Sequence, residues 1–386
     1  MNLPALMTVA SVIVMPQLVY MHLHSLLDSL YEEEASHRVN NLALMATGLI
    51  LGRHVQLWEI ALHVPLDIQL TSITRRFERL MADEDFEVKR FFAPFVSAMV
   101  VSLGNEQACL ILDCTQAGPK CRVVMVALAY HGTVLPVAWR TVTGGKGHVT
   151  GQIQRDLLKE VSGSFRHCRQ VLVLGDAEYS NETLISFLRS QPGWSFVFRV
   201  QDNYHMQPQG RHWDAIAWYG SQSGIQPGQV QHWPDVLYTK THQLSGLTVT
   251  MHWGEGEADP LYLVSNLSAA DTPHLLYEMR AWIETLFGNH KSRGFQLQRT
   301  QMEIPSHIDR LVLVIAIVTC VVLGLGTHLC LSNLTHLIDR TDRRDLSLFQ
   351  LGWRWLHRLI TFNRLHELRI VFRWTFALPP PGYQTA

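Results

Sequence analysis

The chain has 386 residues, of which 47% are hydrophobic and only 17% are charged, and its 32 Lys+Arg residues nearly balance its 33 Asp+Glu residues. A disordered protein would carry more charge and fewer aromatic side chains, and a uniformly basic nucleic-acid coat would carry an excess of Lys and Arg. The composition therefore indicates a globular protein of two or three domains, each with a core large enough to fold unaided.

The near-neutral total hides an uneven distribution of charge. Residues 1–112 hold 7 Lys+Arg and 12 Asp+Glu, residues 113–290 hold 13 and 15, and residues 291–386 hold 12 and 6. The C-terminal quarter is thus basic, and almost all of its basic residues are Arg, which favours bidentate contact with phosphate. A solvated basic helical face would explain the same pattern.

Cysteine spacing and hydropathy bear on the cellular compartment. None of the six cysteines forms a C-x-x-C pair or a zinc-finger spacing, which predicts a cytoplasmic chain with reduced thiols and no structural metal. Residues 1–27 lack charged side chains, but without a basic start they do not fit a signal peptide. Residues 311–331 form an apolar run long enough to span a membrane, and a helix buried on all sides of a large core would look the same.

The first 95 residues are predicted to form a helical N-terminal region. Short helices are expected at residues 41–53, 55–63 and 67–81. Their order resembles a helix-turn-helix arrangement, which makes the arginines of the last helix candidate DNA contacts. These arginines are Arg75, Arg76 and Arg79. An ordinary three-helix bundle with solvated arginines is the alternative.

From residue 107 the chain becomes rich in β-forming residues. Three strands are expected first, the last two joined by a turn at His131–Gly132, and strand–helix alternation follows to residue 200. This order predicts an α/β domain with a mixed sheet. Residues 201–260, rich in Gly, Gln, His and Trp, are interpreted as an inserted, mostly β subdomain.

The remaining domain boundaries are placed where the sequence again becomes rich in apolar residues, from residue 261. Residues 96–200 and 261–335 are predicted to be two parts of one α/β core, and the second part contains a long helix that starts near Thr272 and then the apolar run. Residues 336–386 are predicted to be a basic helical C-terminal region that ends in a disordered tail.

Two expected strands end in an aspartate. Asp113 follows the apolar run ACLIL, and Asp176 follows VLVLG. Ligand sites of open α/β sheets form at the ends of strands, although a single such Asp is commonly a turn former or helix cap. Two of them on neighbouring strands predict a site for a divalent cation, since carboxylate oxygens are the ligands that Mg²⁺ prefers.

A third feature lies on the expected helix after Thr272. A phenol, a guanidinium, a carboxylate and an ammonium group follow at offsets 0, 3, 7 and 14, on Tyr277, Arg280, Glu284 and Lys291. On an uninterrupted α-helix these offsets fall within a sector of roughly 60°. Such a stripe suits phosphate and metal better than an apolar core, and an exposed, ion-paired face is the alternative. Gly288 weakens the helix before Lys291.

These residues carry a resemblance to the bacterial insertion-sequence transposases of the DDE class. The branch in question has a β-strand insertion in a ribonuclease-H-like catalytic domain and a Y-x2-R-x3-E-x6-K signature. The signature is complete in this chain, as Tyr277, Arg280, Glu284 and Lys291. Asp113 and Asp176 match the first two acidic residues of the family.

The resemblance implies an enzyme that cleaves the ends of an insertion sequence and joins them to target DNA. Asp113, Asp176 and Glu284 would hold two Mg²⁺ ions, which Mn²⁺ can replace, for hydrolysis and transesterification of phosphodiesters. Tyr277, Arg280 and Lys291 would contact phosphates. The implied partners are the terminal inverted repeats, target DNA and a second copy of the chain, in the bacterial cytoplasm at the nucleoid.

Two further features of the sequence bear on this resemblance. Relatives stack an extruded base on a Trp of the insertion, whereas the matching residue here is Leu261, with Tyr262 and Trp253 as possible substitutes. Glu178 is an additional carboxylate two residues after Asp176 and a further candidate for a catalytic role.

The resemblance also bears on the alternatives. It favours a buried core helix over a membrane span for residues 311–331. The alternatives to an active transposase are an inactive DNA-binding relic of one and, less favoured, a single-span membrane protein.

Overall fold

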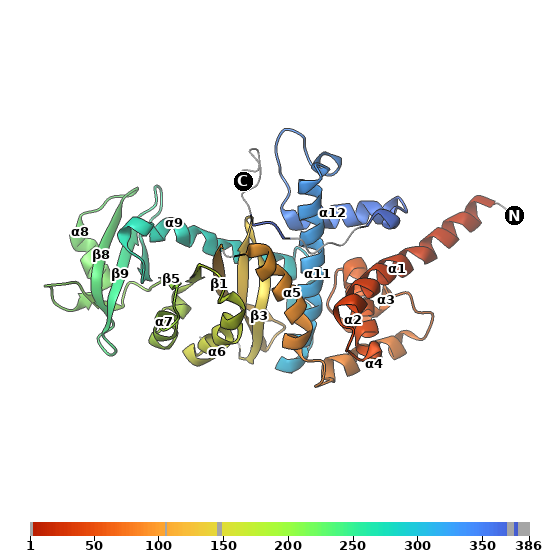
Figure 1. Cartoon of the computed structure of the whole chain (residues 1–386), viewed down its shortest axis with the longest axis horizontal. Helices are drawn as coiled ribbons and strands as arrows, with labels where there is room; N and C mark the ends of the chain where they lie inside the picture. Colours follow the sequence, from red (N-terminus) through yellow and green to blue (C-terminus); the bar gives the residue numbers. More distant parts are fainter. Residues whose placement is uncertain (1–2, 105, 145–148, 369–373, 377–386) are drawn as a thin grey trace.

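The structure, a computed structural model, describes residues 3–104, 106–144, 149–368 and 374–376, with side chains from residue 16 onward. The predicted disordered tail (378–386) lies outside these residues. The molecule is elongated, with the N-terminal helices at one end, the inserted segment at the other and the α/β core between them (Figure 1).

The N-terminal region is helical, as predicted. Its helices are α1 (Leu3–Leu30), α2 (Ser36–Gly52), α3 (Leu57–Leu62), α4 (Leu70–Ala82) and α5 (Val88–Leu103). Helices α2, α3 and α4 correspond to the three expected from the sequence, within a few residues at each end. α2 packs closely on α3, because Gly48 leaves room for the backbone of Ile60.

A mixed sheet forms the centre of the core. Its strands are β1 (Gln107–Ala117), β2 (Cys121–Tyr130), β3 (Thr133–Thr143), β4 (Gln170–Gly175) and β5 (Trp194–Arg199). β2 and β3 are joined by the predicted two-residue turn, in which His131 and Gly132 have φ of 46° and 78°. Positive φ at both turn residues matches the twist of a tight hairpin.

Helices α6 (Gly151–Ser162) and α7 (Glu182–Arg189) connect β3 to β4 and β4 to β5. β4 runs parallel to both β1 and β5, whereas β1, β2 and β3 are antiparallel. The order β3-β2-β1-β4-β5 is that of a ribonuclease-H-like catalytic sheet, and the predicted mixed α/β fold is confirmed.

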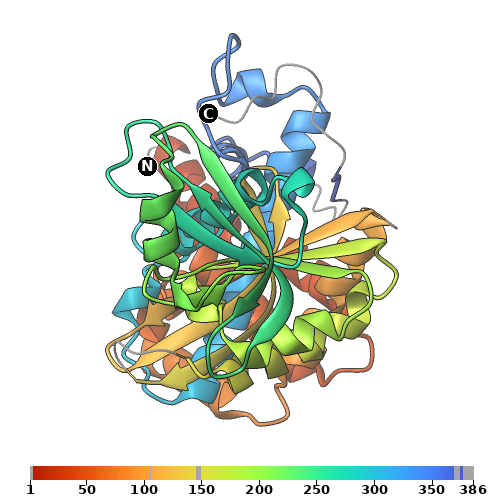
Figure 2. The same cartoon turned by 90° about the vertical axis from the view of Figure 1, so that its left-hand side faces the viewer.

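The inserted segment extends this sheet. It contains β6 (His205–Gln207), β7 (Asp214–Ala215), α8 (Ile216–Ser223), β8 (Val230–Tyr238) and β9 (Leu244–His252), and β10 (Leu261–Ser265) follows it. β10 pairs with β5 on one side and with β9 on the other, so one ten-stranded sheet runs through core and insertion. Viewed from the insertion end, its strands fan out, as accumulated sheet twist requires (Figure 2).

The segment after β10 is not the single long helix that the sequence predicts. It divides into α9 (Pro273–Tyr277), a 3₁₀ turn (Glu278–Ala281) and α10 (Trp282–His290). α9 contacts β5, β9 and β10, the 3₁₀ turn contacts β4, and α10 contacts β1, β2 and β3. The segment therefore crosses the strands on the side opposite α6 and α7 (Figure 1).

The apolar run lies in α11 (Pro305–Leu331), which is long and apolar enough to span a membrane but is 94% buried inside the protein over its most apolar window. It packs on α2, α4, α5, α12 (Leu348–Thr361) and β3. Gly326 and Gly352 allow the closest approach to α12, since a Cβ on Gly352 would lie 1.9 Å from the carbonyl oxygen of Val322. α11 is thus the central helix of the core.

Candidate active site

The two predicted aspartates lie side by side. β1 and β4 are parallel neighbours in a register that pairs Leu112 with Gly175. Asp113 and Asp176 are the next residues on their chains, directly after the last paired residues of β1 and β4, so their carboxylates lie side by side. The prediction that a strand ends at each aspartate is correct for Asp176 only, because β1 continues past Asp113 to Ala117 through its pairing with β2. Each carboxylate accepts a hydrogen bond of 2.7 Å from the following backbone N–H, of Cys114 and Ala177 respectively.

Arg280 joins these aspartates to the third acidic residue. Its guanidinium lies 2.9 Å from Asp113 and 3.6 Å from Asp176, through Nη2, and 2.5 Å from Glu284, through Nη1. Arg280 belongs to the 3₁₀ turn, which contacts β4, and Glu284 belongs to α10, which contacts β1, β2 and β3. Three acidic side chains from three separate elements therefore surround one cation.

The environment of Asp113 opposes its ionisation. Burial raises the pKa of Asp113 to about 6, although the Arg280 guanidinium and the Cys114 N–H act in the opposite direction. Asp176 and Glu284 add like charge nearby. A carboxyl in this position gains from any additional cation, because each one offsets the loss of water around the charge.

The outer residues of the four-residue stripe also approach this cluster. Burial raises the pKa of Tyr277, and the charges of Asp176 and Asp113 add to that effect. Burial lowers the pKa of Lys291, while nearby Asp113 partly restores it. Lys291 lies beyond the last turn of α10, with φ −98° and ψ −127°, so the stripe converges on Asp113 without being one continuous helix face.

Glu178 serves a neighbouring loop. One of its carboxylate oxygens accepts a hydrogen bond from the Val149 N–H, and the other lies 3.5 Å from Arg122. These contacts fasten the start of α6 to the strand edge beside the aspartates.

The candidate DNA-contacting arginines lie on α4, in the N-terminal region, apart from the carboxylates. Arg75 and Arg79 are exposed and lie one helical turn apart. Arg76 is half-buried and donates a hydrogen bond to Asn41 of α2. Two of the three arginines thus face solvent, and the third helps to hold the helices together.

The insertion residues considered for base stacking differ in accessibility. Tyr262 is buried, and its hydroxyl approaches Gly220 of α8. Trp253 is half-buried and donates its indole N–H to the Glu257 carbonyl at 2.9 Å. Leu261, at the start of β10, is also half-buried.

One basic residue near the site was missed by sequence reasoning. Arg199 is exposed at the end of β5, close enough to Tyr277 for its charge to lower the pKa of the phenol. Its position at the end of a third parallel strand, after WSFVF, was the available signal.

The donor set suits a hard divalent cation in its chemistry. Among the described residues, no group of three or more His, Cys, Asp or Glu side chains is close enough together to hold a metal ion. Asp113, Asp176 and Glu284 nevertheless supply only oxygen donors and already converge on one positive group, which is the type of environment that Mg²⁺ or Mn²⁺ takes.

The fold and this carboxylate cluster define a ribonuclease-H-like protein of the DDE type. The transposase DDE domain family matches residues 112–321, more than half of the chain, and the chain belongs to that family. The family usually uses divalent metal ions. The match includes all three acidic residues and the four-residue stripe.

Comparison with other proteins adds two findings. A piggyBac transposase, in a cryo-EM structure of its synaptic complex with hairpin DNA, is similar with a TM-score of 0.40 and 12% sequence identity, over 92% of this chain and 80% of that chain. No curated protein matches the chain.

Proposed function

We propose that the chain is an active DNA transposase that cleaves the ends of an insertion sequence and joins them to target DNA. The observation that carries the proposal is the contact of one guanidinium, that of Arg280, with Asp113, Asp176 and Glu284. Family membership supports the same reaction class.

In this proposal the three carboxylates hold two divalent metal ions, Mg²⁺ or Mn²⁺. When bound, such ions supply activation of a water or 3′-hydroxyl and stabilisation of the leaving oxygen. Asp113 is buried, so its ionised form is most stable when cations surround it. Three ionised carboxylates this close together repel one another, so bound metal ions would stabilise their ionised forms.

The cationic and phenolic groups of the stripe are assigned to the substrate. Arg280 and Lys291 would pair with phosphate oxygens. A phenol is protonated at neutral pH at its ordinary pKa of about 10, and burial raises the pKa of Tyr277 further, so Tyr277 would donate a hydrogen bond. Arg75 and Arg79 are proposed to contact DNA at a distance from the reaction, and Arg76 to position α4 for that contact through its hydrogen bond to Asn41. The partners are the terminal inverted repeats and target DNA, with two copies of the chain on paired ends, in the cytoplasm at the nucleoid.

The test replaces Glu284 with Gln and measures Mg²⁺-dependent strand cleavage on DNA that carries the terminal inverted repeats. We expect cleavage to fall by at least about 100-fold, because loss of one carboxylate ligand removes several kcal/mol of transition-state stabilisation. Glu278→Gln is the matched control, since Glu278 is exposed on the adjoining 3₁₀ turn and is not among the charges that shift the pKa of Asp113. Undiminished cleavage by Glu284→Gln would refute the metal mechanism.

The same assay separates an active enzyme from an inactive relic. A relic would bind DNA and would show no cleavage in either the wild-type chain or the Glu278→Gln control. Cleavage by both, together with its loss in Glu284→Gln, is the result that we expect from an active transposase.

A further inference from the structure

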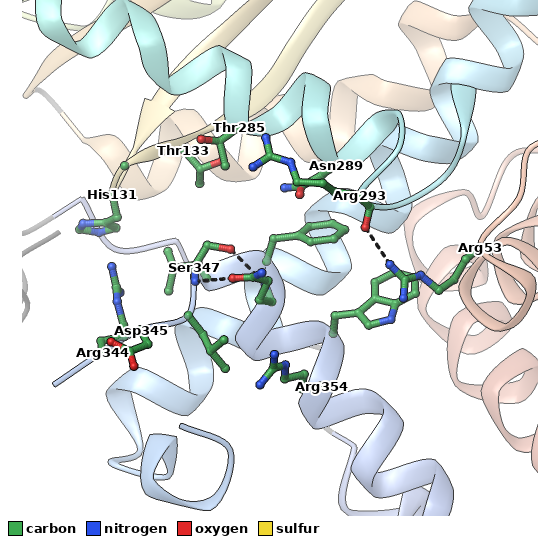
Figure 3. Close-up of a pocket in the computed structure, with 16 residues that line it drawn as sticks. Arg53, His131, Thr133, Thr285, Asn289, Arg293, Arg344, Asp345, Ser347 and Arg354 are labelled. Atoms are coloured by element: carbon green, nitrogen blue, oxygen red, sulfur yellow. Dashed lines mark hydrogen bonds between the residues drawn. The ribbon is translucent and has the colours of Figure 1, made fainter. Parts of the chain in front are cut away.

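A second basic feature lies beside the carboxylates. A cavity of about 560 Å³ opens between the end of α2, α10, the β2–β3 turn and the start of α12 (Figure 3). Four arginines line it, and we call it the arginine pocket. They are Arg53, Arg293, Arg344 and Arg354. A cavity of this size accommodates a small ligand or a segment of a larger one.

The charge of the arginine pocket is strongly positive. Among the described residues that line it, Asp345 is the only carboxylate. Asp345 is paired with two arginines that do not line the pocket, since it lies 2.7 Å from Arg343 and 3.9 Å from Arg340. The first turn of α12, capped by Ser347, adds backbone N–H groups and the positive end of the helix dipole.

Two of the guanidiniums are held by neutral groups. Arg53 donates a hydrogen bond of 2.7 Å to the Arg293 carbonyl and lies over the Trp353 ring at 5.0 Å from its centroid (Figure 3). Arg293 donates to the Glu284 carbonyl at 3.1 Å. Carbonyls and aromatic rings orient a guanidinium without neutralising its charge, so both remain able to bind an anion.

Gly288 makes the position of Arg293 possible. A Cβ on Gly288 would lie 1.8 Å from Nη2 of Arg293, so the guanidinium lies directly against the backbone of α10 at this glycine. The sequence pattern marks Gly288 only as a weak point of the helix. In the structure, the absence of a side chain at Gly288 lets the Arg293 guanidinium pack against the backbone of α10.

The arginine pocket adjoins the carboxylate cluster through α10. Thr285 and Asn289 line the pocket, and Glu284 is the residue immediately before Thr285. The hydrogen bond from Arg293 to the Glu284 carbonyl joins the two sites directly. A DNA strand whose phosphates pass the carboxylates would therefore reach a second, positively charged site on the adjoining face of α10.

We propose that the arginine pocket binds backbone phosphates of the DNA strand beyond the bond that is cleaved. The inference rests on the proposed function and adds a contact that fixes the direction of the strand across α10. Arg53, Arg293, Arg344 and Arg354 contact the phosphates. Gly288 is a positioning residue for Arg293.

The experiment measures binding of a short duplex DNA as a function of salt concentration. Each lost phosphate contact reduces the slope of log affinity against log salt by about 0.9. We expect this reduction for Arg354→Ala, whose side chain is exposed and lacks an acidic partner within the described part of the chain. Arg358→Ala, one turn further along α12, is the control, since Arg358 packs over Phe362 and does not line the pocket.

Gly288→Ala is the second variant, because it leaves every charge in place. Alanine favours the helix over glycine, so folding is retained, while the Arg293 guanidinium must move. We expect a smaller salt slope for this variant too. Wild-type slopes for both Arg354→Ala and Gly288→Ala would overturn the proposal.

Two further arms separate the possible sources of phosphate and the two proposals. If inorganic phosphate raises the melting temperature of the wild-type chain but not of Arg354→Ala, while both give equal DNA slopes, the pocket binds free anions and the DNA assignment is wrong. If Glu284→Gln abolishes cleavage but Arg354→Ala and Gly288→Ala have the salt slope of the wild type, the proposal for the arginine pocket is refuted and the proposed catalysis is supported. Pocket-dependent slopes without Glu284-dependent cleavage support the pocket and refute the proposed catalysis.

Discussion

Arg280 is the residue on which three acidic side chains converge. Its side chain is only 16% exposed, and Asp113 beside it is 17% exposed, so their charges are poorly solvated. Removal of the cation would leave Asp113, Asp176 and Glu284 without a shared partner. Unpaired buried charge is among the most destabilising changes that a single substitution can cause.

We therefore expect Arg280→Ala to lower the free energy of unfolding by about 1–3 kcal/mol at pH 7. The loss should be smaller at pH 5, because the pKa of Asp113 is about 6 and its carboxyl is then protonated. Denaturant unfolding at both pH values measures the effect. Arg155→Ala, at a surface pair with Asp156, is the control with little change expected, and an equal loss for the two variants would contradict the prediction.

Asp309 gives a second prediction at the scale of one residue. Burial raises its pKa to about 6, although Thr141 donates both its N–H, at 2.8 Å, and its hydroxyl, at 2.6 Å, to the carboxylate. The folded state thus holds the proton more tightly than the unfolded state. The stability from this proton is fully present below the unfolded pKa of about 3.9 and is lost as the pH rises through about 6.

Asp309→Asn should remove that dependence, since the amide oxygen can still accept from Thr141. Relative to the variant, the wild-type chain should lose about 2–3 kcal/mol of unfolding free energy between pH 4 and pH 7. Urea titrations across this range provide the measurement. Parallel stability–pH curves for the two proteins would show that the Asp309 carboxyl is not responsible.

At the scale of elements, two glycines set the distance between α11 and α12. A Cβ on Gly352 would lie 1.9 Å from the Val322 carbonyl oxygen, and one on Gly326 would lie 2.0 Å from that of Leu348. The obstructing atoms belong to the backbone, so they cannot rotate away as a side chain would. Leu348 lies in the first turn of α12, and this contact therefore also positions one wall of the arginine pocket.

Gly352→Ala should destabilise the protein by about 1–3 kcal/mol, because the two helices must separate. Gly163→Ala is the matched control, since nothing lies within 4 Å of an added Cβ there and φ is −59°. Thermal unfolding of both variants measures the difference. A Gly352→Ala protein as stable as the wild type would show that the helices adjust without loss.

At the scale of the whole molecule, the burial of α11 has a consequence for membranes. The helix has the length and composition of a membrane span, but α12, β3 and the N-terminal helices cover it. A helix that has its apolar contacts inside the protein has little to gain from lipid. We therefore expect the chain to appear in the supernatant after alkaline carbonate extraction of cells that express it, and retention in the membrane pellet would contradict this structure.

Much of this protein could be predicted from the sequence, because the signals are local. Apolar runs before Asp113 and Asp176 indicate two buried strands, and the turn at His131–Gly132 requires positive φ. The local pattern does not reveal that β1 continues past Asp113 to Ala117, because that extension depends on pairing with β2. The four-residue stripe was recognised by spacing alone. The prediction of one continuous helix there was wrong, since the 3₁₀ turn Glu278–Ala281 intervenes. Spacing cannot reveal that turn, because it depends on how the segment packs across β4.

Contacts between segments that are distant in the sequence could not be predicted from local patterns. Arg53 and Arg293 are 240 residues apart, and nothing in either local sequence predicts their hydrogen bond. The continuation of the core sheet into the insertion depends on the pairing of β10 with both β5 and β9. Local periodicity reports which face of an element is apolar, whereas the partner of that face is chosen by packing of the whole chain. For this reason the core strands, the acidic residues and the family resemblance are predictable from local sequence, whereas the burial of α11 and the shared pocket of four arginines follow from the packing of the whole chain.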